Sequence, residues 1–280
     1  MNNSKQWSSA YPGYIIFLVD QSGSMTGQYS NGKTRAEYTA LVINRTISEI
    51  VNTNMDGDSI RDRVFISLIG YGGSGGNSVD DIRSDYLSAF GDNPIRLENL
   101  KQKVSDGAGG LVEIDVQIPI FIEQKANGLT PMGDAMKFAK DLINSWVGKK
   151  PDNPAPVIIN ISDGLPYSGG NVDESGKTIK EAQEIMSIST NDGHPLIFNV
   201  HIGDDGDPSF EFEENDSQLD EQAKLLFNIS SNVPDSYKDA AMKHDFKVRP
   251  ESRGFVSNAN PEKLVQFINF GSSGGSDLVA

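Results

Sequence analysis

The chain has 280 residues, 37% of them hydrophobic, and a formal net charge of -15. That length allows one large domain with a full core, while the acidic charge disfavours binding to nucleic acid phosphates or anionic membranes. The lack of Cys excludes disulfides, thiolate zinc sites and cysteine nucleophiles. We expect one compact unit at 14–270, preceded by an extension at 1–13 and followed by a flexible tail at 271–280.

The expected location follows from two further sequence features. The first ten residues contain no charged segment followed by an apolar core, and no later segment is apolar over a membrane-spanning length. These features predict a cytoplasmic protein without a membrane partner. A mature secreted chain would show the same features.

The first predicted strand is the apolar run from Tyr14 to Val19, of the kind that is buried on both faces of a sheet. Asp20 ends this run, and Ser22 and Ser24 follow in a turn. A carboxylate and two hydroxyls at a strand end are hard oxygen donors. They suit a small hard cation.

A helix and a second strand come next. Thr34 and Glu37 have the spacing of a capping box, and apolar residues then recur at helical spacing to about Asn52. The segment from Val64 to Tyr71 is another apolar run. The order strand, helix, strand predicts a right-handed crossover between parallel strands, with helices packed on the sheet.

Residues 79–129 interrupt this alternation. Every even position from Val112 to Ile122 is a branched aliphatic residue, and this period of two predicts a strand with one wet face. We predict that it pairs with Pro94 to Leu100, so that 94–126 forms a β-ribbon inserted in the α/β core. A ribbon near the site would suit partner selection, and ordinary edge strands are the alternative interpretation.

The rest of the chain alternates again. Thr130 and Pro131 predict the start of a helix to about Val147, with Thr130 as its N-cap. A strand at 157–161 ends in Ser162 and Asp163, and the later predicted elements are helices near 177–189, 217–227 and 261–270 and strands near 196–202 and 254–256. The predicted fold is a Rossmann-like α/β domain, doubly wound, with a mostly parallel sheet flanked by helices.

Three polar motifs belong to one edge of this sheet. In open α/β sheets, ligands bind beyond the carboxyl ends of the strands, where the strand order reverses. The set resembles the metal-ion-dependent adhesion site of von Willebrand factor type A domains, whose signature is Asp-x-Ser-x-Ser with a distant Thr and a distant Asp. The resemblance covers residues 14–270, and the matching residues are Asp20, Ser22, Ser24, Thr130 and Asp163.

The resemblance implies a bound Mg²⁺, with Mn²⁺ or Ca²⁺ as other candidate ions. In the family, the two Ser and the Thr contact the ion directly, while the two Asp act largely through water. Neutral hydroxyls and waters leave the charge of the ion only partly compensated at close range. A Glu or Asp of a partner protein is therefore the expected further ligand.

A narrower resemblance concerns the stretches Leu-Thr-Pro-Met-Gly at 129–133 and Ser-Asp-Gly at 162–164. Both are similar to those of bacterial type A proteins associated with tellurium resistance and stress signalling. This resemblance implies kinase or phosphatase partners in an intracellular complex.

We expect an interaction module without catalysis. Two alternatives stay open, a metal-assisted phosphohydrolase that uses Asp20 and an extracellular adhesin. The polar motifs also have structural explanations, as strand ends, a helix cap and a turn, in a site that folds without metal.

Three other patterns are weaker. Gly72 to Gly76 fits the Gly-x-Ser-x-Gly nucleophile pattern, with Asp163 and His201 in hydrolase order, but no helix is predicted after it. The stretch 170–178 lacks the spacing of a phosphate-binding loop. The segment 204–221 carries nine acidic residues and no Lys or Arg, which could bind Ca²⁺ or form a solvated acidic loop.

Overall fold

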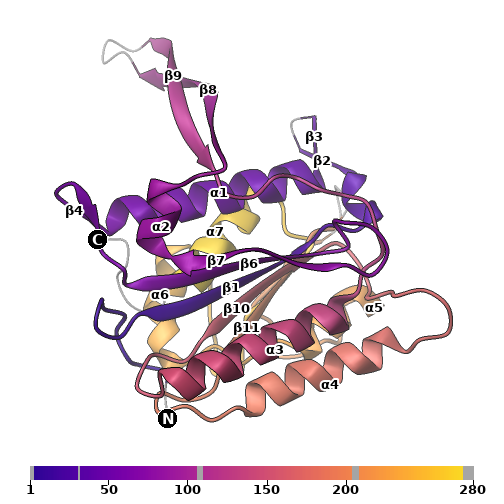
Figure 1. Cartoon of the computed structure of the whole chain (residues 1–280). Coiled ribbons are helices and arrows are strands. Elements are labelled where there is room, and N and C mark those ends of the chain that lie inside the picture. The colour runs from indigo at the N-terminus through magenta and orange to yellow at the C-terminus, as the bar shows by residue number, and fades with distance from the viewer. Residues whose placement is uncertain (1–2, 31, 106–109, 204–207, 274–280) are drawn as a thin grey trace.

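A seven-stranded mixed sheet forms the centre of the computed structural model, which describes residues 3–30, 32–105, 110–203 and 208–273 (Figure 1). Its five inner strands are parallel, and an antiparallel strand lies at each edge. In order across the sheet, the strands are β12 (Phe210–Glu211), β13 (Phe255–Ser257), β11 (Leu196–His201), β10 (Val157–Ser162), β1 (Gly13–Asp20), β6 (Val64–Tyr71) and β7 (Val79–Tyr86).

Strand β1, an inner strand of the sheet, corresponds to the first predicted strand. It pairs in parallel with β10 on one side and β6 on the other, and all eight of its residues are buried. Its side chains alternate between two hydrophobic cores, because successive residues of a strand point to opposite faces. Ile15, Phe17 and Val19 join one core, and Tyr14, Ile16 and Leu18 join the other.

Helices cover both faces of the sheet (Figure 1). Side chains of α1 and α7 enter the first core, and side chains of α3, α4 and α5 enter the second. The helices in the described residues are α1 (Arg35–Thr53), α2 (Leu87–Asp92), α3 (Met132–Lys149), α4 (Glu174–Ser187), α5 (Glu221–Asn228), α6 (Lys238–Lys243) and α7 (Pro261–Ser272). None of them is both long enough and apolar enough to cross a membrane.

The start of α1 confirms the predicted capping box. The Glu37 N–H donates to Thr34 Oγ1 at 3.2 Å, and the Thr34 N–H donates to Glu37 Oε2 at 2.7 Å. Two N–H groups that a helix end leaves without partners are thereby satisfied. Because α1 starts at a fixed residue, the side chains of its first turn have fixed positions beside the end of β1.

The connections make the fold doubly wound. From β1 the chain passes through α1 to β6 on one side of the sheet, and it later returns to β10 on the other side of β1. The strand order therefore reverses between β1 and β10. The prediction of a parallel β1–β6 pair joined by a helix is confirmed, and the sequence analysis missed the edge strand β7 and the short elements β12, α2 and α6.

Two short hairpins accompany the main elements. The first joins β2 (Gln28–Ser30) to β3 (Lys33–Thr34), just before α1. The second joins β4 (Met55–Asp56) to β5 (Ser59–Ile60), just after it. Both lie outside the main sheet.

The inserted ribbon consists of β8 (Arg96–Ser105) and β9 (Leu111–Ile120), which form a separate antiparallel two-stranded sheet. In Figure 1 it projects from the side of the sheet that α1 covers. The alternative of ordinary edge strands is wrong, because neither strand pairs with the seven-stranded sheet. Strand β8 is also longer than the predicted partner segment, and residues 106–109 of the connecting loop lie outside the described residues.

Removal of the outer ribbon should leave the rest of the protein almost unchanged. Replacing residues 99–117 by Asn-Gly keeps the paired residues Glu98 and Ile118 at the ends of a two-residue hairpin turn. We expect the melting temperature to change by less than about 3 °C, because this part of the ribbon pairs only with itself. Circular dichroism on heating measures the shift, and a fall well beyond that size would show that the ribbon supports the core.

Candidate metal centre

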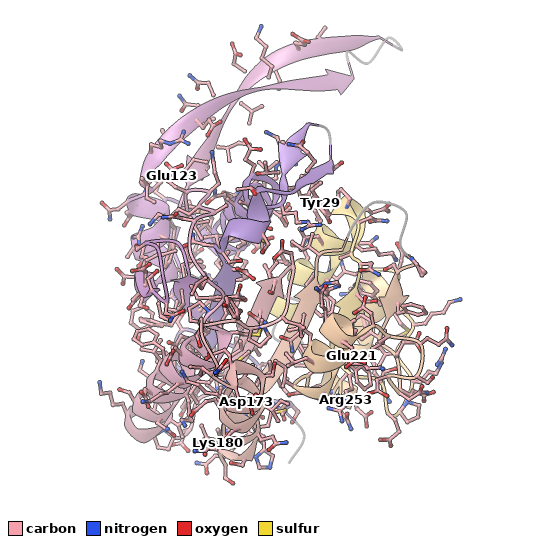
Figure 2. All side chains as sticks on the ribbon, turned by 90° about the vertical axis from the view of Figure 1, so that its right-hand side faces the viewer. Tyr29, Glu123, Asp173, Lys180, Glu221 and Arg253 are labelled. Carbon is pink, nitrogen blue, oxygen red and sulfur yellow. The ribbon has the colours of Figure 1, made fainter. Side chains whose placement is uncertain are left out.

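The predicted site lies at the carboxyl edge of the sheet, where β1 and β10 end and the strand order reverses. Figure 2 looks onto this edge, on which Asp173 and Glu221 mark the starts of α4 and α5. Loops from separate parts of the chain meet here. Such a switch point is the usual place for a ligand in a doubly wound fold.

Asp20 is the last residue of β1 and is only 1% exposed. Its Oδ1 accepts a hydrogen bond of 2.9 Å from the Ser22 N–H, and its Oδ2 accepts one of 2.6 Å from the Ser162 hydroxyl. Ser162 ends the neighbouring strand β10. The carboxylate is therefore oriented from both sides, by its own turn and by the next strand.

The two serines connect Asp20 to Asp163. A 3₁₀ turn at Gly23–Thr26 follows Ser22, and it brings Ser24 Oγ to 3.0 Å from Ser22 Oγ. The Ser24 hydroxyl also donates to Asp163 Oδ1 at 2.7 Å. Four of the five predicted residues thus belong to one continuous chain of hydrogen bonds, although 139 residues separate Ser24 from Asp163.

The fifth residue, Thr130, arrives on a segment that lies beside the serine turn. The Gly23 N–H donates to the Gly128 carbonyl at 2.9 Å, and the Asn127 N–H donates to the Gln21 carbonyl at 2.9 Å. The prediction that Thr130 caps α3 is wrong. The N-cap is Pro131, and its side chain makes no capping hydrogen bond. The N–H of Gly133, in the first turn, donates instead to Glu174 Oε1 at 3.0 Å.

The segment of Thr130 approaches Ser22 this closely because glycines separate them. Gly72 has a φ of +85°, and a Cβ on it would lie 2.2 Å from the Leu129 carbonyl oxygen and 3.2 Å from the Ser22 Cα. A Cβ on Gly128 would lie 2.5 Å from the Gly72 carbonyl oxygen. The loop from Gly72 to Gly76 thus allows the backbone segments of the site to pack closely together. It is followed by strand β7, whereas a nucleophile of the Gly-x-Ser-x-Gly pattern would be followed by a helix.

The electrostatics of the site favour a cation. Burial, and secondly the nearby charge of Asp163, raise the pKa of Asp20 to about 6, although hydrogen bonds from Ser162 and Ser22 oppose the shift. Arg35 Nη1 lies 2.8 Å from Asp163 Oδ2. The ionised form of Asp20 is therefore costly while no further positive charge is near it.

The donor set suits a hard divalent ion. Three hydroxyls could contact Mg²⁺ directly, and the carboxylates of Asp20 and Asp163 could hold its waters. In the described part of the chain there is no group of three or more His, Cys, Asp or Glu that could hold a metal. A metal at this edge would therefore depend on the hydroxyls of Ser22, Ser24 and Thr130.

Sequence reasoning missed two residues of this site. Ser162 directly precedes Asp163, and its position as the last residue of a buried strand could have indicated that it faces the end of β1. Arg35 stands at the start of a helix, where a cation is unfavourable. A cation at this unfavourable position could have indicated that Arg35 has a partner elsewhere in the fold. His201, which the hydrolase pattern would need, is buried at the end of β11, and burial lowers its pKa.

The fold and this edge together define a class of protein, the doubly wound α/β domains with a polar switch-point site. No protein-family model and no curated protein matches the sequence. Several solved structures do resemble the chain. The minor pilin PilB from Streptococcus sanguinis has a TM-score of 0.51 at 11% identity, over 98% of this chain and 63% of that chain.

Two other similar structures have lower scores. The vWF domain of the type V pili tip protein Mfa5 from Porphyromonas gingivalis has a TM-score of 0.49 at 12% identity, over 94% of this chain and 95% of that chain. The pilus adhesin SpaC from Lactobacillus rhamnosus GG has a TM-score of 0.47 at 15% identity, over 92% of this chain. The chain spans only 30% of the length of SpaC. Identities this low indicate a shared fold alone.

The comparisons contradict the predicted cytoplasmic location. The structure named above whose TM-score exceeds 0.5 is a minor pilin. The prediction rested on the residue pattern of the first ten residues and on the lack of an apolar segment of membrane-spanning length, and neither feature separates a mature surface protein from an internal one. The narrower resemblance to tellurium-resistance proteins finds no support in these structures, and kinase or phosphatase partners stay an untested prediction.

Proposed function

We propose that this chain is the binding domain of an extracellular adhesin, which holds an acidic residue of a partner protein through Mg²⁺ at the carboxyl edge of its sheet. The observation that carries the proposal is the hydrogen-bonded series from Asp20 through Ser22 and Ser24 to Asp163. The similarity of the fold to a minor pilin supports the extracellular part of the proposal.

The residues of the site have separate roles in this proposal. The three hydroxyls bind the ion without neutralising it, and the two carboxylates orient its water shell. An ion bound there would supply a positive charge to which a Glu or Asp side chain of the partner protein could bind. Since the protein carries a charge of -15, it would repel an acidic partner without the ion, and the metal would decide whether binding occurs.

The decisive test is a calorimetric titration of Mg²⁺ and Mn²⁺ into protein stripped of metal. We expect one ion per chain for the parent and a loss of affinity of about 100-fold in a Ser22→Ala, Ser24→Ala double variant. A matched control is the Ser59→Ala, Ser187→Ala double variant, because these serines lie on the outside of the fold.

Circular dichroism separates loss of the site from loss of the fold. Both double variants should keep the parent spectrum, because removing an exposed hydroxyl or a small polar group at a turn costs little folding energy. A parent chain that binds neither ion would contradict the proposal, as would equal affinities in the two double variants.

A further inference from the structure

A loop beside the candidate metal centre exposes large apolar side chains. Leu165 is 40% exposed, Tyr167 is 54% exposed and Val172 is 60% exposed, and all three lie between the end of β10 and the start of α4. Among the described residues, ten large hydrophobic side chains are exposed, and three of them lie in this short stretch. Single exposed apolar residues are common on protein surfaces, whereas several together indicate a contact surface.

Tyr167 lies directly beside a proposed metal ligand. The Tyr167 N–H donates to the Thr130 carbonyl at 2.9 Å, and the Thr130 N–H donates to the Tyr167 carbonyl at 2.8 Å. Two residues that exchange both bonds are directly opposite one another in an antiparallel bridge. The side chains of such a pair point to the same side, with their Cβ atoms about 5 Å apart. The Tyr167 ring therefore lies next to the Thr130 hydroxyl.

The loop that carries these side chains is held in place on both sides of Tyr167. Pro166 is buried between the exposed Leu165 and Tyr167. The Asn77 Nδ2 group donates to the Ser168 carbonyl at 2.7 Å. A Cβ on Gly169 would lie 3.4 Å from Leu129 Cδ1, so the loop packs on the segment that precedes Thr130. A partner that binds to a loop already fixed in this way pays little for ordering it.

The structure of the chain itself does not explain why these residues are apolar. Neither hydrophobic core contains Leu165, Tyr167 or Val172 in the part of the chain that the structure describes. Burial of their surface would be favourable, and only a bound partner can provide it. An ion at the site would attract a carboxylate, and the apolar loop next to the ion suits an uncharged group joined to that carboxylate.

We propose that Leu165 and Tyr167 determine which acidic residues the metal centre accepts. The preferred Glu or Asp of the partner protein has a large apolar or aromatic side chain beside it, which packs on these two residues. This inference rests on the proposed function, and it names the chemistry that the partner presents next to its carboxylate. An acidic residue in purely polar surroundings would bind more weakly.

Two small carboxylates serve as probes on protein loaded with Mn²⁺. Acetate presents a carboxylate with one methyl group, and phenylpropionate presents the same carboxylate joined to a phenyl ring. Water-proton relaxation falls when either probe displaces a metal-bound water, so the signal reports binding at the ion alone. We expect phenylpropionate to reach half-displacement at an about 10-fold lower concentration than acetate, because its ring leaves water on binding.

Variants of the loop show whether these side chains cause the preference. Tyr167→Ser and Leu165→Ser should each reduce it to about 3-fold or less, because apolar contact area is lost. The acetate concentration should stay the same, since neither side chain is a proposed ligand of the ion. Tyr11→Ser is the matched control. Tyr11 is 51% exposed and precedes the opposite end of β1, so this variant should keep the parent preference.

The outcomes separate this inference from the proposed function. A parent that binds both probes equally overturns the inference while leaving the metal site demonstrated. The inference also fails if both loop variants keep the parent preference, if they lose acetate binding to the same extent, or if Tyr11→Ser loses the preference too. A parent that binds no Mn²⁺, or whose bound Mn²⁺ loses no water to acetate, overturns the proposed function and the inference together.

Discussion

Asp20→Asn should lower the Mg²⁺ affinity about 100-fold and, at pH 7, stabilise the metal-free protein against unfolding. Both effects follow from the loss of the negative charge of Asp20. That charge would attract the ion, and in the metal-free protein its burial costs folding free energy at neutral pH. The pKa of Asp20 is raised from 3.8 to about 6 in the folded chain, chiefly by burial. A shift of that size corresponds to at most about 3 kcal/mol of folding free energy.

The sign of the pH dependence follows from the raised pKa. The folded state binds the Asp20 proton more tightly than the unfolded state does, so protonation favours folding. This contribution is fully present below pH 3.8 and is lost as the pH rises through about 6. An Asn at this position has no proton to lose, and it can still accept the Ser22 N–H hydrogen bond. The Ser162 hydroxyl can turn to the Gly164 carbonyl, 3.3 Å away.

Urea unfolding between pH 4.5 and 8, in the presence of a chelator, measures this difference. We expect Asp20→Asn to exceed the parent in stability above pH 6 and the difference to shrink below it. Asp141→Asn, on the exposed side of α3, is the matched control and should follow the parent. Parent and Asp20→Asn curves that stay parallel over the whole range would show that Asp20 does not titrate near pH 6.

Titration of the parent with Mg²⁺ at several pH values gives an independent check. Protons compete with the ion for Asp20, so the affinity should fall as the pH drops below about 6.

Gly128→Ala should destabilise the fold by about 3 kcal/mol and weaken metal binding at the same time. A Cβ at this position would lie 2.5 to 2.7 Å from three backbone atoms of Gly72 and Gly76. Backbone atoms in a packed loop cannot move aside as the end of a flexible side chain can. The clash must instead separate the segment of Thr130 from that of Ser22, which the Gly23–Gly128 hydrogen bond holds together.

The control for this variant lies in the same region. Gly164 directly follows Asp163, and a Cβ on it would meet no atom within 4 Å. Gly164→Ala should therefore keep the parent stability and metal affinity. Chemical unfolding measures the stability of the two variants, and calorimetry measures their metal affinity. Equal stabilities of Gly128→Ala and Gly164→Ala would mean that the glycine loops can rearrange to relieve the clash.

The inner elements could be predicted well from the sequence, because short-range patterns such as apolar runs and helix caps determine where they form. The apolar run that became β1 can only be a buried strand, and the Thr34–Glu37 pair fixes the start of α1. Strand β7 was missed because it is a half-exposed edge strand in which charged residues replace the apolar ones. Helix α2 was missed because six residues that include Gly91 give no helical period.

The candidate site could be predicted in composition but not in geometry. The five signature residues stand at strand or helix ends, and the switch point brings such ends together. The partners Ser162 and Arg35 reach the site through contacts between distant segments, which no sequence period encodes. The false assignment of Thr130 as an N-cap arose because Thr before Pro suits two different roles.

The position of β1 inside the sheet has a consequence for local unfolding. Asp20 stands on a strand that is paired on both sides and buried along its whole length, so its amide hydrogens should exchange with solvent only through global opening. The other proposed ligands stand on turns and loops, which open more readily. A bound ion would therefore slow amide hydrogen exchange in those loops without changing exchange in β1. The ion would connect loops that open readily to a strand that opens only when the whole protein unfolds.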